Sequence, residues 1–462
     1  MKFIKIILIF LSIHSFGQNI EIKGHAPDYK GEELTIYKNY DFITKDRIVI
    51  KKIIVDSNGD YAFKFSCKKT EKIYIDAGYF NLYLYIYPNQ KANILIPKYR
   101  KVPKGDIFFK QIELPAIVDT EDTTELNSLI LAFDKRLTIL NNKYYNSILD
   151  NDKKIINTIK SDLDNKFKST NNYFRTYKKY KLGLCEYPAY MNEIKKFINI
   201  YFSSEVVMHD AYYELLNITF PSLITYNQFK KEKGFNYVRL LKYQKETLCY
   251  YGVKNKELTQ LIILKSLHDG AFKPLLKKDI YIDAIKEIHR RAVNINIKNL
   301  AKKILDKVTY LSKGYTCPII EGLNSKGEKI NTREYKGKYI YYMFFERFSR
   351  MIEEEMDIVA RIADSKDYLK VLVLCDENNR KKNISILKKY KLDNNALFIK
   401  NFSKLKHKFK VVVSPSYFLV DKKGDIIQAH TIKPNPKLYR TLNNIHIKEL
   451  KEGNIKETKY FK

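Results

Sequence analysis

The first hundred residues alternate between apolar and polar positions. Short segments of such alternation are the pattern of half-buried β-strands. Between two of them, residues 56–60 contain an Asn-Gly pair, which favours a tight hairpin turn. The pattern predicts an antiparallel β domain over residues 19–115 that ends in a basic, proline-containing connection, 98–115. The expected strands are 20–24, 34–37, 47–55, 61–65, 73–78, 81–88 and 92–97.

From about Thr123 to Leu311 the apolar positions recur at spacings of three and four, and glycine and proline are nearly absent. This is the pattern of helices that each bury one face, and it predicts about five to seven helices over 116–311. Their many Tyr and Phe side chains leave two interpretations, a groove for a peptide or, more simply, helix core. The helices are expected to break near residues 183–188, 221–222, 234 and 252.

Uninterrupted apolar segments follow Gly314. Tyr339–Phe345 and Tyr368–Asp376 show no alternation, which is typical of parallel strands buried on both faces. Apolar residues at helical spacing lie between them, and a strand–helix–strand unit crosses over in the right-handed sense. Residues 312–450 should therefore form an α/β domain, with a helix at 383–390, strands at 396–399 and 417–420, a last helix at 438–444, and a tail over 451–462.

The junction between the first apolar strand and its helix is the place where we expect a functional site. Ser349 stands where this helix would begin and is suited to cap its N-terminus. Such a helix end lies at the carboxyl edge of the sheet, where open α/β folds usually bind ligands. Glu353, Glu354 and Glu355 follow in the first turn, where the helix dipole stabilises carboxylates without any catalytic role.

The segment Lys338–Met356, KYIYYMFFERFSRMIEEEM, resembles the first strand and active-site helix of a thioredoxin-fold domain of the TlpA/ResA type. Members of that family are thiol–disulfide oxidoreductases of the cell envelope, and their segment reads roughly GKxVxLxFWATWCxPCRxExP. Gly337-Lys338, Phe344-Phe345 and Glu353 to Met356 occupy matching positions. The resemblance covers about the final third of the chain and implies a thioredoxin-like fold there.

The two redox cysteines of that family are replaced here. Their positions hold Ser349 and Ile352, in the sequence Ser349-Arg350-Met351-Ile352. In an active member the first cysteine is a thiolate at the helix N-terminus and the second resolves the mixed disulfide. Serine supplies no thiolate and isoleucine resolves nothing, so an ordinary CxxC redox cycle is not expected.

A second part of the resemblance lies at Phe409–Ile427, FKVVVSPSYFLVDKKGDII. In the thioredoxin fold a cis proline ends a loop beside the active site, and an apolar strand, an Asp and a Gly turn follow. Ser414-Pro415-Ser416 has this context, so Pro415 is the expected cis proline. Cys317-Pro318 and the residues after it resemble the opening hairpin of the family.

Residues 1–18 and the β domain that follows them indicate the cellular compartment in which we expect the protein. Residues 1–18 have Lys2 and Lys5, an apolar stretch and then small residues, which is the pattern of a secretory signal peptide. A buried strand or a membrane anchor is the alternative, but the stretch is shorter than the roughly twenty residues of a span. The β domain, with its segment 55–65, resembles a module that often precedes TlpA-like domains in exported proteins of Bacteroidetes. We expect a periplasmic or cell-envelope protein without an integral membrane span.

Charge changes this picture little. The chain has 84 Lys and Arg against 52 Asp and Glu, a formal net charge of +32. Gathered in one stripe, this surplus would suit nucleic acid or anionic lipid. The lysines are instead spread along the chain among Ile, Asn and Tyr, as on a solvated surface. No nucleic-acid partner is expected; a basic adaptor would bind with steep salt dependence.

The cysteines are scattered and odd in number, so at least one has no partner within the chain. None lies in a CxxC and no Cys/His cluster has zinc-like spacing, so neither a metal nor a cofactor is expected. Cys375 ends an apolar strand and is most simply a small buried residue. Cys317 is the candidate for one-cysteine chemistry. The full set is Cys67, Cys185, Cys249, Cys317 and Cys375.

The sequence as a whole predicts a multidomain α+β protein. Its parts are a β domain, a helical middle and a thioredoxin-like α/β domain. The expected function is a redox-inactive envelope protein that binds or assists another protein through the helix end and the loop of Pro415. The alternative is a thiol–disulfide oxidoreductase acting through Cys317 or a partner thiol. For Ser349 as a nucleophile, His407 and His430 are the nearest bases in sequence, and no motif places either one there.

Overall fold

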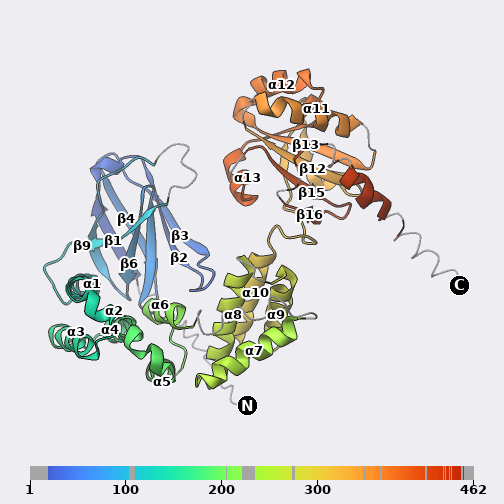
Figure 1. Ribbon diagram of the computed structural model, residues 1–462. Coiled ribbons are helices and arrows are strands. Elements are labelled where there is room, and N and C mark those ends of the chain that lie inside the picture. Colours follow the sequence, from blue (N-terminus) through green and yellow to red (C-terminus); the bar gives the residue numbers. More distant parts are fainter. Residues whose placement is uncertain are drawn as a thin grey trace, which may run out of the picture. The chain divides into compact units, whose positions relative to one another are not determined.

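The computed structural model divides the chain into two compact units, Met1–Leu305 and Asp306–Lys462 (Figure 1). The predicted signal peptide, the breaks at 221–222 and 234, and the tail beyond 451 lie outside the described residues. The structure describes residues 19–102, 110–203, 205–220, 235–272, 276–346, 350–364, 367–411, 414–429, 431, 433–435, 438, 440–448 and 451.

The first unit begins with a β-sandwich whose two sheets enclose one apolar core, with Ile22, Ile36, Phe63 and Leu84 among its buried members. The alternation of the sequence is seen directly, because every second side chain enters this core. One sheet has the order β4-β1-β7-β9 and the other β3-β2-β5-β6-β8. Their strands are β1 (Asn19–His25), β2 (Glu33–Asn39), β3 (Arg47–Ile54), β4 (Asp60–Ser66), β5 (Glu71–Ala77), β6 (Phe80–Ile86), β7 (Lys91–Leu95), β8 (Ile112–Pro115) and β9 (Ile117–Val118).

Two features of the sandwich differ from the expected antiparallel domain. β1 pairs with β7, and β6 with β8, in parallel. The expected connection 98–115 contains β8, and β9 follows it. Alternation identifies a strand but not the direction of its neighbour, and segments of four and two residues are too short to show a period.

Ten α-helices follow in the described residues, more than the five to seven expected. One reason is that α1 and α2 are separated at Tyr144 without glycine or proline to mark the break. The helices are α1 (Leu126–Lys143), α2 (Tyr145–Leu149), α3 (Lys153–Lys166), α4 (Asn172–Glu186), α5 (Ile194–Phe202), α6 (Asp210–Thr219), α7 (Tyr237–Tyr250), α8 (Lys256–Phe272), α9 (Lys278–Arg290) and α10 (Ile295–Thr309).

The expected break near residues 183–188 is found, because α4 ends at Glu186; Gly183 itself lies inside this helix. A Cβ atom there would come within 2.8 Å of Leu215 Cδ2 and 2.9 Å of Tyr201 Cε1. The glycine therefore lets α5 and α6 pack closely on α4. The chain changes direction just afterwards, in the 3-10 helix Tyr187–Glu193, where Pro188 is at the start. The expected break at Gly252 is found, directly after α7, with φ at +90°.

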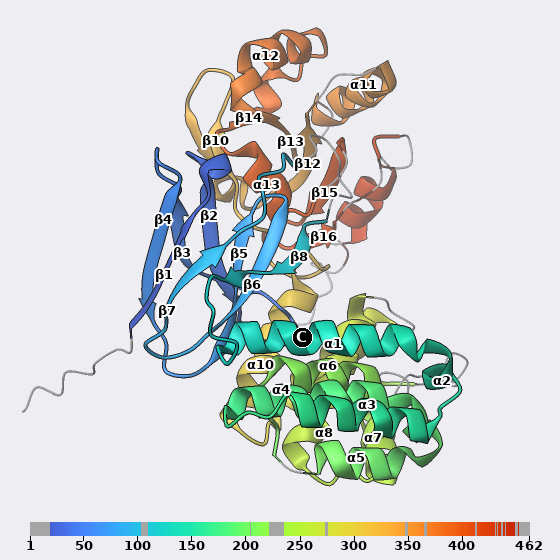
Figure 2. The same ribbon diagram turned by 90° about the vertical axis from the view of Figure 1, so that its left-hand side faces the viewer.

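A polar network joins the sandwich to the helices. Tyr85 on β6 and Tyr173 on α4 each donate a hydrogen bond of 2.9 Å to Asp210, the first residue of α6. His209, which caps α6, lies against the ring of Tyr173 in a tilted arrangement with ring centroids 4.1 Å apart. Its pKa is lowered because it is buried. In Figure 2, α1 runs beside the end of the sandwich, where Asn127 hydrogen-bonds both backbone groups of Tyr85.

The second unit contains a seven-stranded sheet with the order β11-β10-β14-β13-β12-β15-β16. β12 is parallel to β13 and antiparallel to β15, and β13 is parallel to β14. α11 joins β12 to β13, as the sequence predicts. The elements are β10 (Glu321–Leu323), β11 (Lys329–Asn331), β12 (Tyr339–Phe345), α11 (Arg350–Asp364), β13 (Leu369–Asp376), α12 (Arg380–Lys389), β14 (Ala396–Ile399), α13 (Phe402–Lys408), β15 (Ser416–Val420) and β16 (Ile426–Gln428).

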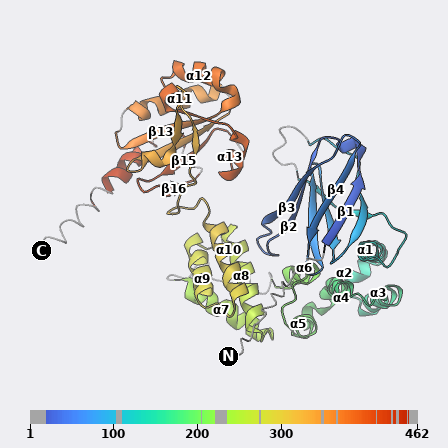
Figure 3. The same cartoon turned by 180° about the vertical axis from the view of Figure 1, so that it is seen from behind.

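β12 sends its side chains alternately into two separate cores. Tyr341, Met343 and Phe345 enter a core with α11 and α12, whereas Tyr342 and Phe344 enter a core with α13. Figure 3 shows α11 and α12 on one side of this sheet and α13 on the other. Of the described helices in this unit, α13 was not expected from the sequence. Residues 440–448 are helical, close to the predicted last helix.

Candidate functional site

The candidate site is the corner where β12 ends, α11 begins and the chain enters β15. Ser349 lies outside the described residues, so its role as N-cap stays a prediction, and the side chains of Arg350 and Met351 are likewise not described. Ile352 is described. It is 5% exposed and packs in the same core as Met356 and Val359 on the inner face of α11. The position expected for the second redox cysteine is therefore filled by a core side chain.

The loop before β15 is tied to the end of β12 by Ser414. Its Oγ donates a hydrogen bond of 3.2 Å to the carbonyl of Phe344 and accepts one of 3.1 Å from the backbone N–H of Glu346. The peptide bond between Ser414 and Pro415 is cis. These contacts place Pro415 beside the carboxyl end of the central strand, next to the start of α11.

An ion pair lies at the same strand end. Lys406 on α13 contacts the carboxylate of Glu346 at 2.6 Å, and the Lys406 side chain is only 20% exposed. Both backbone and side chain of Glu346 are therefore held, the first by Ser414 and the second by Lys406. Nothing in the spacing of Glu346, Lys406 and Ser414 along the chain indicates that these residues meet.

Under the corner, Glu355 on α11 accepts a hydrogen bond from the hydroxyl of Tyr417 on β15. Tyr417 is buried and stacks on Tyr341, with ring centroids 5.7 Å apart. Burial, and then the bond to the Glu355 carboxylate, raises the pKa of Tyr417 well above its usual value. Glu355 thus has a partner on the sheet face beneath α11 in addition to its place near the helix start. A signal for this existed: it follows Ile352 by three positions, on the buried face of the helix.

The two cysteines of this unit lie away from the corner. Cys317 is 7% exposed and belongs to the core on the α13 side, with Tyr342 and Phe344, whereas α11 covers the opposite face. Its burial raises the pKa of its thiol to about 12. Cys375 is fully buried on β13, as expected, and its thiol pKa is also raised by burial. Neither thiol is available as a thiolate at neutral pH.

The remaining candidate groups are not gathered at the corner. His407 lies on the exposed side of α13, and His430 is outside the described residues. All five cysteines are described and none is disulfide-bonded; Cys249 is the exposed one. Within the described ranges, no group of three or more His, Cys, Asp or Glu side chains is arranged to hold a metal ion. No helix in those ranges is both long and apolar enough to cross a bilayer.

Replacing Ser414 by alanine should loosen the corner. The change removes one donor and one acceptor, and leaves the carbonyl of Phe344 and the N–H of Glu346 without these partners. We expect the free energy of unfolding to fall by about 1–2 kcal/mol, as for partly buried hydrogen bonds. Denaturant titration measures this. Ser403→Ala, on the exposed side of α13, is the matched control and should change stability little.

Comparison with known proteins places the similarity in part of the chain. No family model matches, and no curated protein matches. Among solved structures, the chain is similar to the thioredoxin domain of a thiol-disulfide oxidoreductase from Bacteroides vulgatus, with 21% identity over 29% of this chain and 96% of that one, at a TM-score of 0.26. A thioredoxin-like protein from Bacteroides caccae matches with 14% identity over 42% and 74%, at 0.27. An exposed lipoprotein thioredoxin from Streptococcus pneumoniae matches with 23% identity over 28% and 99%, at 0.24.

Proposed function

We propose that the C-terminal unit is a thioredoxin-like domain that binds an extended segment of another exported protein and performs no thiol–disulfide exchange with its own cysteines. The observation that carries this proposal is the absence of a thiol at the corner among the described residues. Ile352 occupies the core, and Cys317 and Cys375 are both buried. Ser349, which the sequence places at the helix start, supplies no thiolate.

The topology supports the fold assignment independently of any likeness in sequence. A central strand, β12, is followed by a helix and a parallel neighbour, β13, and it pairs on its other side with an antiparallel strand, β15. A cis proline directly precedes β15. This is the arrangement that the sequence resemblance implies for a thioredoxin-like domain.

Peptide binding needs only what remains at the corner. A strand end, a helix N-terminus and a loop fixed by Ser414 offer backbone groups to an extended chain, and strand addition of this kind requires no catalytic side chain. The signal-peptide pattern of residues 1–18 is the reason that we propose such a partner in the periplasm or envelope. The alternative enzyme, acting through Cys317, is opposed by that residue's burial and by the raised pKa of its thiol.

Restoring the cysteines tests the redox half of the proposal. The full-length protein should reduce insulin no faster than the reductant alone, and Cys317→Ser should change nothing. Ser349→Cys/Ile352→Cys should gain turnover, because it returns a thiol to a helix N-terminus and a resolving thiol one turn later. Turnover by the unmodified protein that disappears in Cys317→Ser would refute redox inactivity.

Thiol capture tests the binding half. In a Cys249→Ser background, which removes the exposed thiol, Ser349→Cys is mixed with peptides that carry an activated disulfide. Docking at the corner should make this thiol react faster than a control thiol introduced by Ser403→Cys. A thiol-free peptide of the same sequence should slow the reaction by competition. Equal rates at the two thiols, without competition, would contradict a peptide-binding corner.

A further inference from the structure

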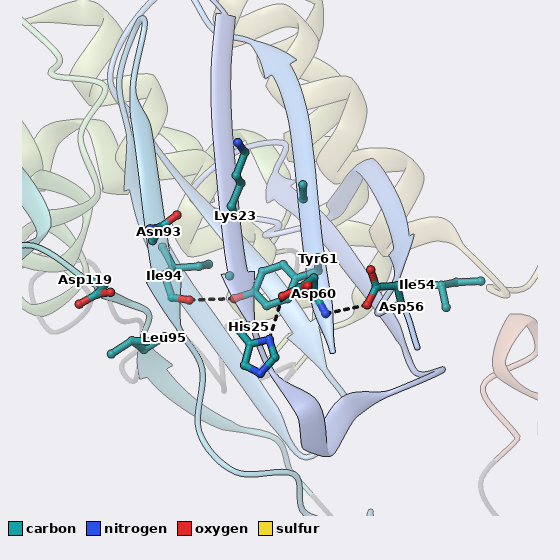
Figure 4. A pocket seen from close by; sticks show the side chains of 12 residues that line it. Lys23, His25, Ile54, Asp56, Asp60, Tyr61, Asn93, Ile94, Leu95 and Asp119 are labelled. Carbon is teal, nitrogen blue, oxygen red and sulfur yellow. Dashed lines mark hydrogen bonds and ion pairs between the residues drawn. The ribbon is translucent and has the colours of Figure 1, made fainter. Parts of the chain in front are cut away.

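A groove crosses the outer face of the β4-β1-β7-β9 sheet, on the first unit. It is an open hollow of about 560 Å³, within the range of ligand-binding sites. Ile20 and Ile22 of β1 are buried in the sandwich, so Lys23 and His25 of the same strand face outward. Figure 4 shows Asp119 and Leu95 at one end of the groove, Asp56 and Ile54 at the other, and His25 and Asp60 between them.

The floor of the groove is held together by a hydrogen bond across three strands. Tyr61 on β4 donates a hydrogen bond of 3.0 Å to the carbonyl of Ile94 on β7, and so spans β1, which lies between these strands. It passes at Gly24, where a Cβ atom would come within 2.6 Å of the same carbonyl. On the outward face, the small side chain of Ala62 leaves the hollow open.

The charges in the groove are opposite to those of the chain as a whole. Three carboxylates, Asp56, Asp60 and Asp119, line it in a chain with a formal net charge of +32. Its one lysine, Lys23, is neutralised by Glu21 at 2.9 Å, and Asp60 is bonded to His25 at 2.8 Å. Within the described part of the chain, neither Asp56 nor Asp119 has an ion-pair partner. The groove therefore offers one unneutralised carboxylate at each end.

The side chains that line the groove determine which kind of cation can bind. The carboxylates of the groove form no metal-binding group within the described residues. Instead an aliphatic side chain stands beside each end carboxylate: Ile54 is 68% exposed and Leu95 49% exposed. Lysine and arginine match such a pair, because their stems pack on apolar surface while the charged head reaches a carboxylate.

The spacing fits an extended chain. The N–H of Asp119 bonds the carbonyl of Asn93, Asn93 pairs with Lys23, and Lys23 pairs with Ala62, so these residues form a row across neighbouring strands. Asp56 pairs with Asp60, two residues from Ala62 and one strand further out, so about 19 Å across the strands and about 7 Å along them separate Asp119 from Asp56. The resulting distance of about 20 Å matches two residues six apart in an extended peptide, which lie on the same face.

We propose that this groove binds an extended basic segment of a partner polypeptide, with lysine or arginine side chains six positions apart at Asp119 and Asp56. This site is separate from the corner of the C-terminal unit and does not depend on the function proposed for it. It gives the N-terminal unit a recognition role of its own.

The test uses the full-length protein and the fluorescent peptide Gly-Lys-Thr-Ile-Thr-Ile-Thr-Lys-Gly, followed by anisotropy. Asp119→Asn and Asp56→Asn should each raise Kd by roughly three- to five-fold, the size expected for exposed ion pairs, and the double variant by about tenfold or more. Asparagine keeps the acceptor that Asp56 presents to the N–H groups of Asn58 and Asp60, so the turn should survive. Asp150→Asn, also exposed and in the same unit, is the matched control and should leave Kd unchanged.

Two matched peptides complete the test. Glutamate in place of both lysines should abolish binding, and placing the two lysines next to each other should weaken it. Ile54→Ser and Leu95→Ser should raise Kd without altering its salt dependence. Equal binding of the acidic peptide, or a double variant no weaker than Asp150→Asn, would overturn the proposal.

Discussion

Replacing Phe344 by alanine is expected to lower the free energy of unfolding of the C-terminal unit by about 3–5 kcal/mol. The ring is fully buried at the centre of the sheet, where it contacts Phe402, Phe409 and Phe418. Its removal leaves a cavity in the core on the α13 side, and a close-packed interior closes such a space only in part.

The same change should also affect the corner. The carbonyl of Phe344 accepts the hydrogen bond from Ser414, so a shift of this strand end releases the loop of Pro415. Hydrogen exchange should therefore increase at β12 and β15 as well as in the core. Denaturant unfolding gives the stability. Ile447→Ala, at an exposed position in the same unit, should cost no more than about 0.5 kcal/mol. A loss for Phe344→Ala as small as this would contradict the packing described.

Replacing Asp210 by alanine should destabilise the first unit by about 3 kcal/mol. The carboxylate accepts hydrogen bonds from the buried Tyr85 and the half-buried Tyr173, so its loss leaves both hydroxyl groups without this acceptor. The change also removes a negative charge from the first turn of α6. Because Tyr85 is on β6 and Tyr173 on α4, the joint between sandwich and helices should loosen.

A double-mutant cycle separates this hydrogen bond from general damage. In Tyr85→Phe the hydroxyl that needs Asp210 is absent, so Asp210→Ala should cost less in that background than alone. Asp210→Asn, which keeps one acceptor oxygen, should lower the free energy of unfolding less than Asp210→Ala does. Additive losses would mean that Tyr85 and Asp210 do not act together. Denaturant unfolding, with hydrogen exchange at β6 and α6, provides the measurement.

Much of the fold could be predicted because apolar and polar residues follow regular patterns in many segments of the chain. Continuous apolar residues identified β12 and β13, and alternation identified β1 to β7 of the sandwich, within a few residues of their ends. The sequence could not show that β1 and β7 run parallel, since alternation is the same in either direction. It also could not show that Gly183 lies inside α4 and admits neighbouring helices, because a glycine that ends a helix and one that admits a neighbouring helix look alike in a single sequence.

The sequence predicted the position of the candidate site better than it predicted the contacts within it. The cysteines missing from Ser349 and Ile352, and the proline at 415, could be seen in the sequence. The bonds of Ser414 to Phe344 and Glu346, and of Tyr417 to Glu355, join residues about 60 to 70 positions apart. Only the folded sheet brings such residues together, so no local pattern could reveal them.

The alternation of β12 between two cores has a consequence for how this strand finds its place. In a sheet with one solvent-exposed face, a shift in strand register by one residue exposes apolar side chains to water and is strongly disfavoured. In Tyr339–Phe345 both sets of side chains are apolar or aromatic, so the hydrophobic effect discriminates poorly between the correct alignment and a slipped one. Polar contacts at the strand end must then determine the register. Ser414 bonds both Phe344 and Glu346, so it would fix the register of the central strand.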